Sequence, residues 1–180
     1  MKRKIFISLD IPEKAKKRLV LTTEKWKDLP VKLTKEKNLH LTLAFLGFVP
    51  EENILEICEK VQKAAAKKDS FDITFDKIAL FPDEKDPRAI ALLGEPSDQL
   101  LNLVNDLEKN LGISRAPKKS FRAHITLGRL RKIKWEALSE KPEVLENFSL
   151  SIPVETVDIM ASGFSEGERE YTLIESCPLE

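Results

Sequence analysis

Residues 38–47 read NLHLTLAFLG, and residues 122–131, found 84 positions further along, read RAHITLGRLR. Both of the chain's histidines, His40 and His124, therefore occupy a His-apolar-Thr-apolar pattern. One such tetrapeptide would carry little weight, because a single histidine in a strand is usually structural. Two copies in register predict an internal repeat.

The offset of 84 extends to the segments before each histidine. It relates Pro12 to Pro96 and the apolar run 5–9 to the run 89–93, and it relates the amphipathic helices expected after them. Further on, FDITF at 71–75 resembles FSLSI at 148–152 at a slightly smaller offset. We expect one bilobal domain over residues 1–180, built from two strand–helix–strand pseudo-repeats with motif copies at 40–43 and 124–127.

Periodicity along the chain mixes strands with helices. Apolar runs or two-residue alternation predict strands, and three-to-four-residue spacing predicts helices. Strands are expected at 5–9, 39–46, 71–81, 89–93, 121–128, 148–154, 157–164 and 171–176, and helices after Pro12, Pro50 and Pro96 and at 135–140. Ser97 and Gly112 are suited to begin and end the third helix. This order predicts an α+β fold with two pseudo-symmetric lobes of antiparallel or mixed sheet, helices outside and a cleft between the lobes.

Alternation within each motif decides which side chains face the cleft. Residues i and i+2 of a strand share a face, so His40 lies beside Thr42, and His124 lies beside Thr126. The intervening leucines and isoleucine belong to the core. Burying two imidazoles and two hydroxyls without partners would be costly, so their face should line the cleft.

Two imidazoles across a cleft suit in-line displacement at phosphorus. One can take a proton from attacking water while the other protonates the departing sugar oxygen, because the pKa of histidine lies near working pH. Thr42 and Thr126 can donate hydrogen bonds to phosphate oxygens. Arg129, five residues past His124, supplies a fixed positive charge for the transition state.

Other chemistries lack their residues. Two histidines without a carboxylate cluster fall short of the three protein ligands usual for catalytic zinc, so no metal is expected. No Gly-x-Ser-x-Gly elbow, phosphate-binding glycine loop or dinucleotide fingerprint is present, so no cofactor is expected. Cys58 and Cys177 are predicted to be reduced thiols.

Charge is balanced overall but unevenly placed. The net charge is zero, which argues against non-specific nucleic-acid binding by the whole surface. Residues 109–135 nevertheless contain nine basic and no acidic residues. The basic residues are Lys109, Arg115, Lys118, Lys119, Arg122, Arg129, Arg131, Lys132 and Lys134. Such a run is either a solvated face or, because it surrounds His124, part of a binding site for a polyanion.

The paired motif resembles the signature of the two-histidine (2H) phosphoesterases, and within them the RNA 2′,3′-cyclic phosphodiesterases, also called 2′-5′ RNA ligases. The likeness covers the whole chain, from the opening strand at 6–12 and the block at 38–47 to the loop at 81–88 and the segments 121–129 and 162–171. The resemblance implies hydrolysis of the cyclic phosphate to a 2′-phosphate, with reversible 2′-5′ ligation in some members. It assigns His40 as proton donor, His124 as proton acceptor, and Thr42, Thr126 and Arg129 as phosphate-binding residues. Ala44 and Ala123 depart from the lysine and proline that many members carry there, which leaves substrate preference open.

Two alternatives remain at this point. One is a 2H enzyme for small cyclic nucleotides or ADP-ribose phosphates, and the other is a non-catalytic nucleotide- or RNA-binding module. The expected partner is RNA with a 2′,3′-cyclic phosphate end, bound by a monomer. With no apolar run of membrane-spanning length and no signal peptide, we expect a cytoplasmic protein without membrane contact.

Overall fold

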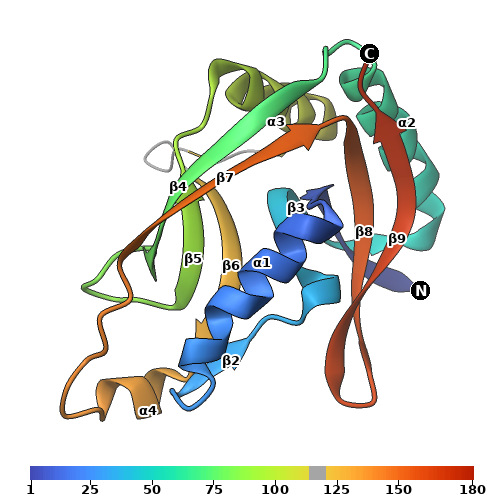
Figure 1. Cartoon of the computed structure of the whole chain (residues 1–180). Helices are drawn as coiled ribbons and strands as arrows, with labels where there is room; N and C mark the ends of the chain where they lie inside the picture. Colours follow the sequence, from blue (N-terminus) through green and yellow to red (C-terminus); the bar gives the residue numbers. More distant parts are fainter. Residues whose placement is uncertain (114–120) are drawn as a thin grey trace.

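The protein is an α+β structure built on one nine-stranded sheet, seen in a computed structural model that describes residues 1–113 and 121–180 (Figure 1). The strands are β1 Lys2–Asp10, β2 Val31–Leu33, β3 His40–Pro50, β4 Phe71–Phe81, β5 Ala89–Gly94, β6 Ala123–Leu130, β7 Glu146–Val154, β8 Thr156–Ser165 and β9 Glu168–Pro178. The α-helices are α1 Glu13–Thr23, α2 Ile54–Ala65, α3 Asp98–Leu111 and α4 Lys132–Glu136. Three short 3-10 turns cover Glu24–Trp26, Glu36–Asn38 and Glu51–Asn53. The predicted α+β class is confirmed.

The sheet consists of two four-stranded halves that meet in the middle. Its order is β7-β4-β5-β6-β3-β1-β8-β9, and β2 pairs with β6. Neighbouring strands in the described residues are antiparallel. The halves join where β6 and β3 meet, and these are the two strands that carry the histidines.

The same offset of 84 relates strands that hold equivalent places in the two halves. Adding 84 to the residue numbers of β1 gives a range that overlaps β5, and adding 84 to those of β3 gives a range that overlaps β6. The same shift places the first residue of β4 one position before the first residue of β8. Yet β4 pairs with β5, and β8 pairs with β1. The third strand of each repeat thus crosses into the half built around the other repeat.

This crossing corrects one sequence interpretation. The similar segments 71–75 and 148–152 are not equivalent strands of the two repeats. They lie side by side in β4 and β7, with Phe71 opposite Val154 and Phe75 opposite Leu150. Their likeness reflects a shared environment, because both strands alternate between a buried and an exposed face.

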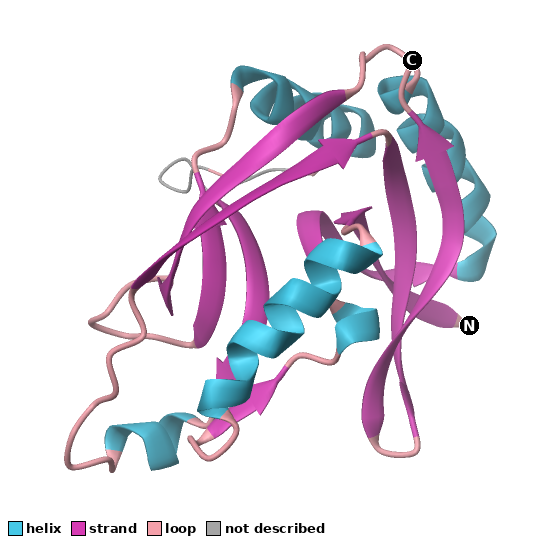
Figure 2. Ribbon diagram, in the orientation of Figure 1, coloured by secondary structure: helices cyan, strands magenta, loops and turns pink. Residues whose placement is uncertain are grey.

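One hydrophobic core unites the sheet and the helices. The alternating residues Ile5, Ile7 and Leu9 of β1 are fully buried and belong to this core. Helices α2 and α3 pack against each other, whereas α1 lies separately along the sheet (Figure 2). Contact of α1 with β7 is direct, because Arg18 donates to the Ser149 carbonyl at 2.7 Å and lies over the Phe148 ring.

Element ends follow local chemistry. The Ser97 hydroxyl accepts a hydrogen bond from the Leu100 backbone N–H, and Gly112 ends α3 with a φ of 67°, as predicted. The short helix expected at 135–140 is wrong in position, since α4 begins at Lys132 and ends at Glu136. The basic residues Arg115, Lys118 and Lys119 lie outside the described residues. Within residues 1–113 and 121–180, the helices are too short or too polar to cross a membrane.

Candidate active site

The two motifs are brought together by a direct strand pairing. Leu41 of β3 lies opposite Ile125 of β6 in antiparallel register. One residue to either side, antiparallel geometry sets His40 across from Thr126 and Thr42 across from His124. All four polar residues are partly exposed, so they share one accessible face of the sheet.

The opposite face of the same strands is core. The apolar members of the two motifs, Leu41, Leu43, Ile125 and Leu127, are 0–2% exposed. The predicted division into a polar face and a core face is therefore confirmed. Burying these residues fixes the register, because a slip of one residue would place them on the accessible face.

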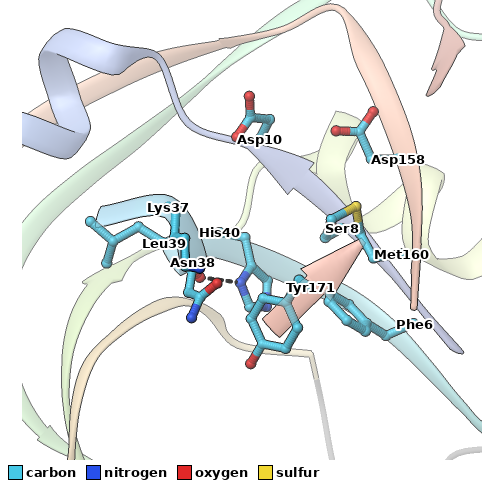
Figure 3. A pocket seen from close by; sticks show the side chains of 10 residues that line it. All are labelled: Phe6, Ser8, Asp10, Lys37, Asn38, Leu39, His40, Asp158, Met160 and Tyr171. Carbon is cyan, nitrogen blue, oxygen red and sulfur yellow. Dashed lines mark hydrogen bonds between the residues drawn. The ribbon is translucent and has the colours of Figure 1, made fainter. Parts of the chain in front are cut away.

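Hydrogen bonds at both ring nitrogens orient His40, and Figure 3 shows the one with Asn38. Its Nδ1 lies 2.7 Å from the Asn38 carbonyl oxygen, and its Nε2 lies 2.8 Å from Thr42 Oγ1. A carbonyl can only accept, so Nδ1 carries a proton. Nε2 is then the nitrogen that gains or loses a proton, and it points along the face toward the threonine.

Two aromatic rings enclose the His40 imidazole. Phe6 of β1 lies 5.1 Å away between ring centroids, and Tyr171 of β9 meets the imidazole edge-on at 5.1 Å. Figure 3 shows Tyr171 beside His40, and both residues line a small cavity of about 40 Å³. Ser8, Asp10, Asp158 and Met160 also line this cavity. The cavity lies on the β1–β8 side of His40, away from His124.

His124 is held by a matching arrangement on the other half. Its Nδ1 lies 2.9 Å from the Arg122 carbonyl oxygen, two residues earlier, as Asn38 is to His40. Its ring stacks on Phe81 with centroids 4.1 Å apart and planes 17° apart. The Arg122 guanidinium lies 4.8 Å from the Phe81 ring and donates to the Pro82 carbonyl. Nδ1 again carries a proton, which leaves Nε2 as the basic nitrogen of His124.

The electrostatics of the site disfavour protonation of both imidazoles. Burial lowers the pKa of His40 and of His124, because a charged ring loses hydration there. The positive charge of Arg129 lowers the pKa of both as well. Arg129 lies on β6, the strand that carries His124, and its side chain is exposed. Its partner in the neighbouring strand β2 is Lys32.

Several residues around the histidines were not among the predicted site residues. These are Phe6, Asn38, Phe81, Arg122 and Tyr171. Asn38 and Arg122 each contact the histidine two residues later through a backbone carbonyl, so their residue types carry no signal for this contact. The three aromatic residues come from other strands, and no local pattern relates them to the motifs.

The histidines are not part of a metal-ligand cluster among the described residues. Within residues 1–113 and 121–180, no three His, Cys, Asp or Glu side chains come together as a metal site would require. Cys58 and Cys177 are free and buried, and burial raises the pKa of each thiol to about 11. They are therefore unreactive thiols rather than ligands or nucleophiles.

Comparison with known proteins gives a consistent result. The family described as LigT like Phosphoesterase matches residues 9–91 and 92–166. An RNA 2′,3′-cyclic phosphodiesterase of Thermotoga maritima is 31% identical over 97% of this chain and 95% of its own length. A protein of the same description from Bacillus subtilis is 29% identical over 89% and 84%.

Solved structures share the whole architecture. A protein of Thermus thermophilus superposes with a TM-score of 0.83 at 27% identity, covering 98% of this chain and 97% of the other. LigT of E. coli complexed with 3′-AMP superposes with a TM-score of 0.80 at 25% identity, covering 99% of each chain.

Proposed function

The chain belongs to the LigT-like phosphoesterase family, and we propose that it hydrolyses RNA 2′,3′-cyclic phosphate ends to 2′-phosphates. The observation that carries the proposal is the pairing of Leu41 with Ile125, which sets two His/Thr pairs on one accessible face. Curated relatives described as RNA 2′,3′-cyclic phosphodiesterases, similar over most of the chain, support the substrate.

In the proposed reaction, His124 is the base and His40 is the acid. Nε2 of His124 takes a proton from water as the water oxygen bonds to phosphorus. The bond between phosphorus and the 3′ oxygen breaks, and Nε2 of His40 gives its proton to that oxygen. The product carries a free 3′ hydroxyl and a 2′-phosphate, and the pair of histidines has moved one proton. The Nδ1 contacts with carbonyl oxygens support these roles, since they leave both Nε2 atoms for the chemistry.

Thr42, Thr126 and Arg129 are proposed to hold the phosphate. The Thr42 hydroxyl already lies at the reactive nitrogen of His40. Thr126 follows His124 by two residues in β6, as Thr42 follows His40 in β3. Arg129 adds a permanent positive charge, whereas each histidine is charged only while it holds the transferred proton. Charge-assisted hydrogen bonds to phosphate oxygens strengthen as negative charge develops in the transition state.

We further infer that residues 1–180 act as one bilobal, monomeric unit without a cofactor. The two histidines come from different repeats of the same chain, so one protomer holds both. The repeat offset and the meeting of β3 with β6 support this arrangement. Sedimentation of the active enzyme tests it, and a dimer that loses activity on dilution would contradict it.

The decisive experiment uses two substrates. The protein is incubated with an oligoribonucleotide ending in a 2′,3′-cyclic phosphate and, separately, with adenosine 2′,3′-cyclic phosphate. We expect turnover of the oligonucleotide to a 2′-phosphate, identified by its phosphorus NMR shift and its resistance to a 3′-phosphatase. Turnover confined to the small nucleotide, or a 3′-phosphate product, would overturn the proposal.

A further inference from the structure

One face of the β3-β1-β8-β9 half continues the active-site face away from His40. Antiparallel partners point to the same side of a sheet, so the registers of these strands define cross-strand rows. Successive rows contain Thr42, Ser8, Asp158 and Ser176, then Phe45, Phe6, Met160 and Leu173, then Phe48, Lys4, Ser162 and Tyr171, and finally Phe164 and Arg169. The rows change from polar beside His40 to aromatic and basic further out.

The aromatic rings in the outer rows are unusually exposed. Phe45, Phe48 and Phe164 are 68%, 71% and 71% exposed. Phe45 and Phe48 are three residues apart and would normally face opposite sides of a strand. A bulge between them, at Leu46 and Gly47 with a φ of 72° at the glycine, brings both onto one face. We call this surface, Phe45, Phe48 and Phe164 with Lys4 and Arg169, the aromatic face.

Charge on the aromatic face is positive. Lys4 lies between Phe48 and Ser162 in its row, and the Arg169 guanidinium lies 5.1 Å from the centre of the Phe164 ring. Glutamates on either side of Arg169 are engaged elsewhere, because Glu168 pairs with Lys35 and Glu170 with Lys37. Within residues 1–113 and 121–180, neither Lys4 nor Arg169 forms an ion pair with a carboxylate, so both charges are available to an anion that approaches this face.

The other half of the sheet has a different outer surface, although Phe81 with Arg122 over its ring lies beside His124 there. The exposed positions of β4 include Asp72, Thr74 and Asp76, and those of β7 include Ser149 and Ser151. Among the described residues, large exposed aromatic side chains occur on the first half and not on β4 to β7. The symmetric fold therefore presents an asymmetric surface on the two sides of its histidines.

We propose that the aromatic face binds the single-stranded RNA that leads to the cyclic phosphate, with bases stacked on Phe45, Phe48 and Phe164 and phosphates near Lys4 and Arg169. Exposed rings on an open sheet face, interleaved with cations, suit unpaired bases, which stack without regard to sequence. Continuity with His40 places this strand where its last phosphate reaches the site. The inference rests on the proposed function and adds that the enzyme distinguishes an RNA end from a free nucleotide by stacking.

The test compares two substrates with the same reacting end, adenosine 2′,3′-cyclic phosphate and an oligoadenylate hexamer ending in that group. Phe48→Ala and Phe164→Ala should leave kcat/KM for the mononucleotide within about twofold and lower it for the hexamer by about tenfold each, the loss expected for one base stack. Phe164→Trp should keep hexamer turnover. Leu55→Ala, which removes a 70% exposed side chain from α2, is the matched control and should change neither.

A binding measurement separates this inference from the reaction. Fluorescence anisotropy with a labelled hexamer ending in a 2′-phosphate should show about tenfold weaker binding for each variant. Lys4→Ala should reduce the slope of log affinity against log salt by about 0.7. Wild-type protein that is inactive on both substrates would contradict the proposed function. The binding measurement would still show whether the aromatic face binds RNA. Equal losses on both substrates, or hexamer turnover and affinity at wild-type level in both alanine variants, would overturn the aromatic face as an RNA platform.

Discussion

Leu41 on β3 and Ile125 on β6 lie directly opposite each other, 84 positions apart in the sequence, where the two halves of the sheet meet. Antiparallel partners related in this way exchange places under a local two-fold axis. Each histidine consequently lies across from the threonine of the other motif. This relationship turns two separate tetrapeptides into one site.

Loss of either histidine should remove most of the rate. His40→Ala and His124→Ala are each expected to lower kcat/KM on a cyclic-phosphate oligonucleotide by about 10²–10⁴-fold, the range for one general acid or base. Both side chains are partly exposed, so the thermal midpoint should barely move. Steady-state kinetics and thermal melts check this. Near wild-type turnover in either variant would show that the two imidazoles do not act together.

Arg129 and Arg131 form a matched pair for testing the phosphate contact. Both are exposed, but Arg129 influences the pKa of both histidines. Arg129→Ala should raise the barrier by about 2–4 kcal/mol, as loss of a donor to a developing oxyanion does, whereas Arg131→Ala should change kcat/KM little. Arg129→Lys should recover part of the loss, since lysine restores charge without the bidentate fork. Equal kinetics for the two alanine variants would make Arg129 an ordinary surface residue.

Chelation should leave the reaction intact. The proposed steps use imidazole, hydroxyl and guanidinium groups, and no cluster of metal ligands occurs in residues 1–113 and 121–180. Dialysis against EDTA, followed by assay in metal-free buffer, is expected to preserve kcat/KM within about twofold. Activity that EDTA abolishes and one divalent ion restores would require a metal mechanism.

Local pattern was enough to predict the parts of the site that lie on single strands. Two-residue alternation correctly separated the polar face of each motif from Leu41 and Ile125, and the cap residues Ser97 and Gly112 correctly bounded α3. Such features depend on neighbours within a few residues. The buried face of each motif and the ends of α3 can therefore be predicted from the sequence alone.

Features that depend on distant strands could not be predicted in this way. The crossing of β4 and β8 between halves depends on strand pairing across the sheet, and the likeness of segments 71–75 and 148–152 pointed to a different correspondence. The three-residue strand β2 lies between polar segments and gains its place by pairing with β6. Phe81 reaches His124 because β4 and β6 flank β5. The bulge that aligns Phe45 with Phe48 likewise appears only in the pairing of β3 with β1.

The pH dependence of kcat/KM should reflect the lowered pKa values of both histidines. The reaction needs one proton on the pair, with His40 protonated and His124 neutral. Burial lowers the pKa of each ring, and Arg129 lowers both further, so the pair loses this proton at a lower pH than free imidazole would. We therefore expect kcat/KM to peak on the acid side of the ordinary histidine value, about 6.5, and to fall as pH rises through neutrality.

Replacing Arg129 should move this profile in a defined direction. Removing its positive charge raises the pKa of both histidines, so the fall on the alkaline side should shift to higher pH even though the rate at every pH is lower. Arg131→Ala provides the control, because Arg131 is not among the charges that lower either pKa. The measurement is kcat/KM from about pH 4.5 to about pH 9, a range that brackets the histidine titration, in buffers of constant ionic strength, for wild type and both variants. A wild-type maximum at alkaline pH, or an Arg129→Ala profile shifted toward acid, would show that these two histidines do not share the proton that the reaction needs.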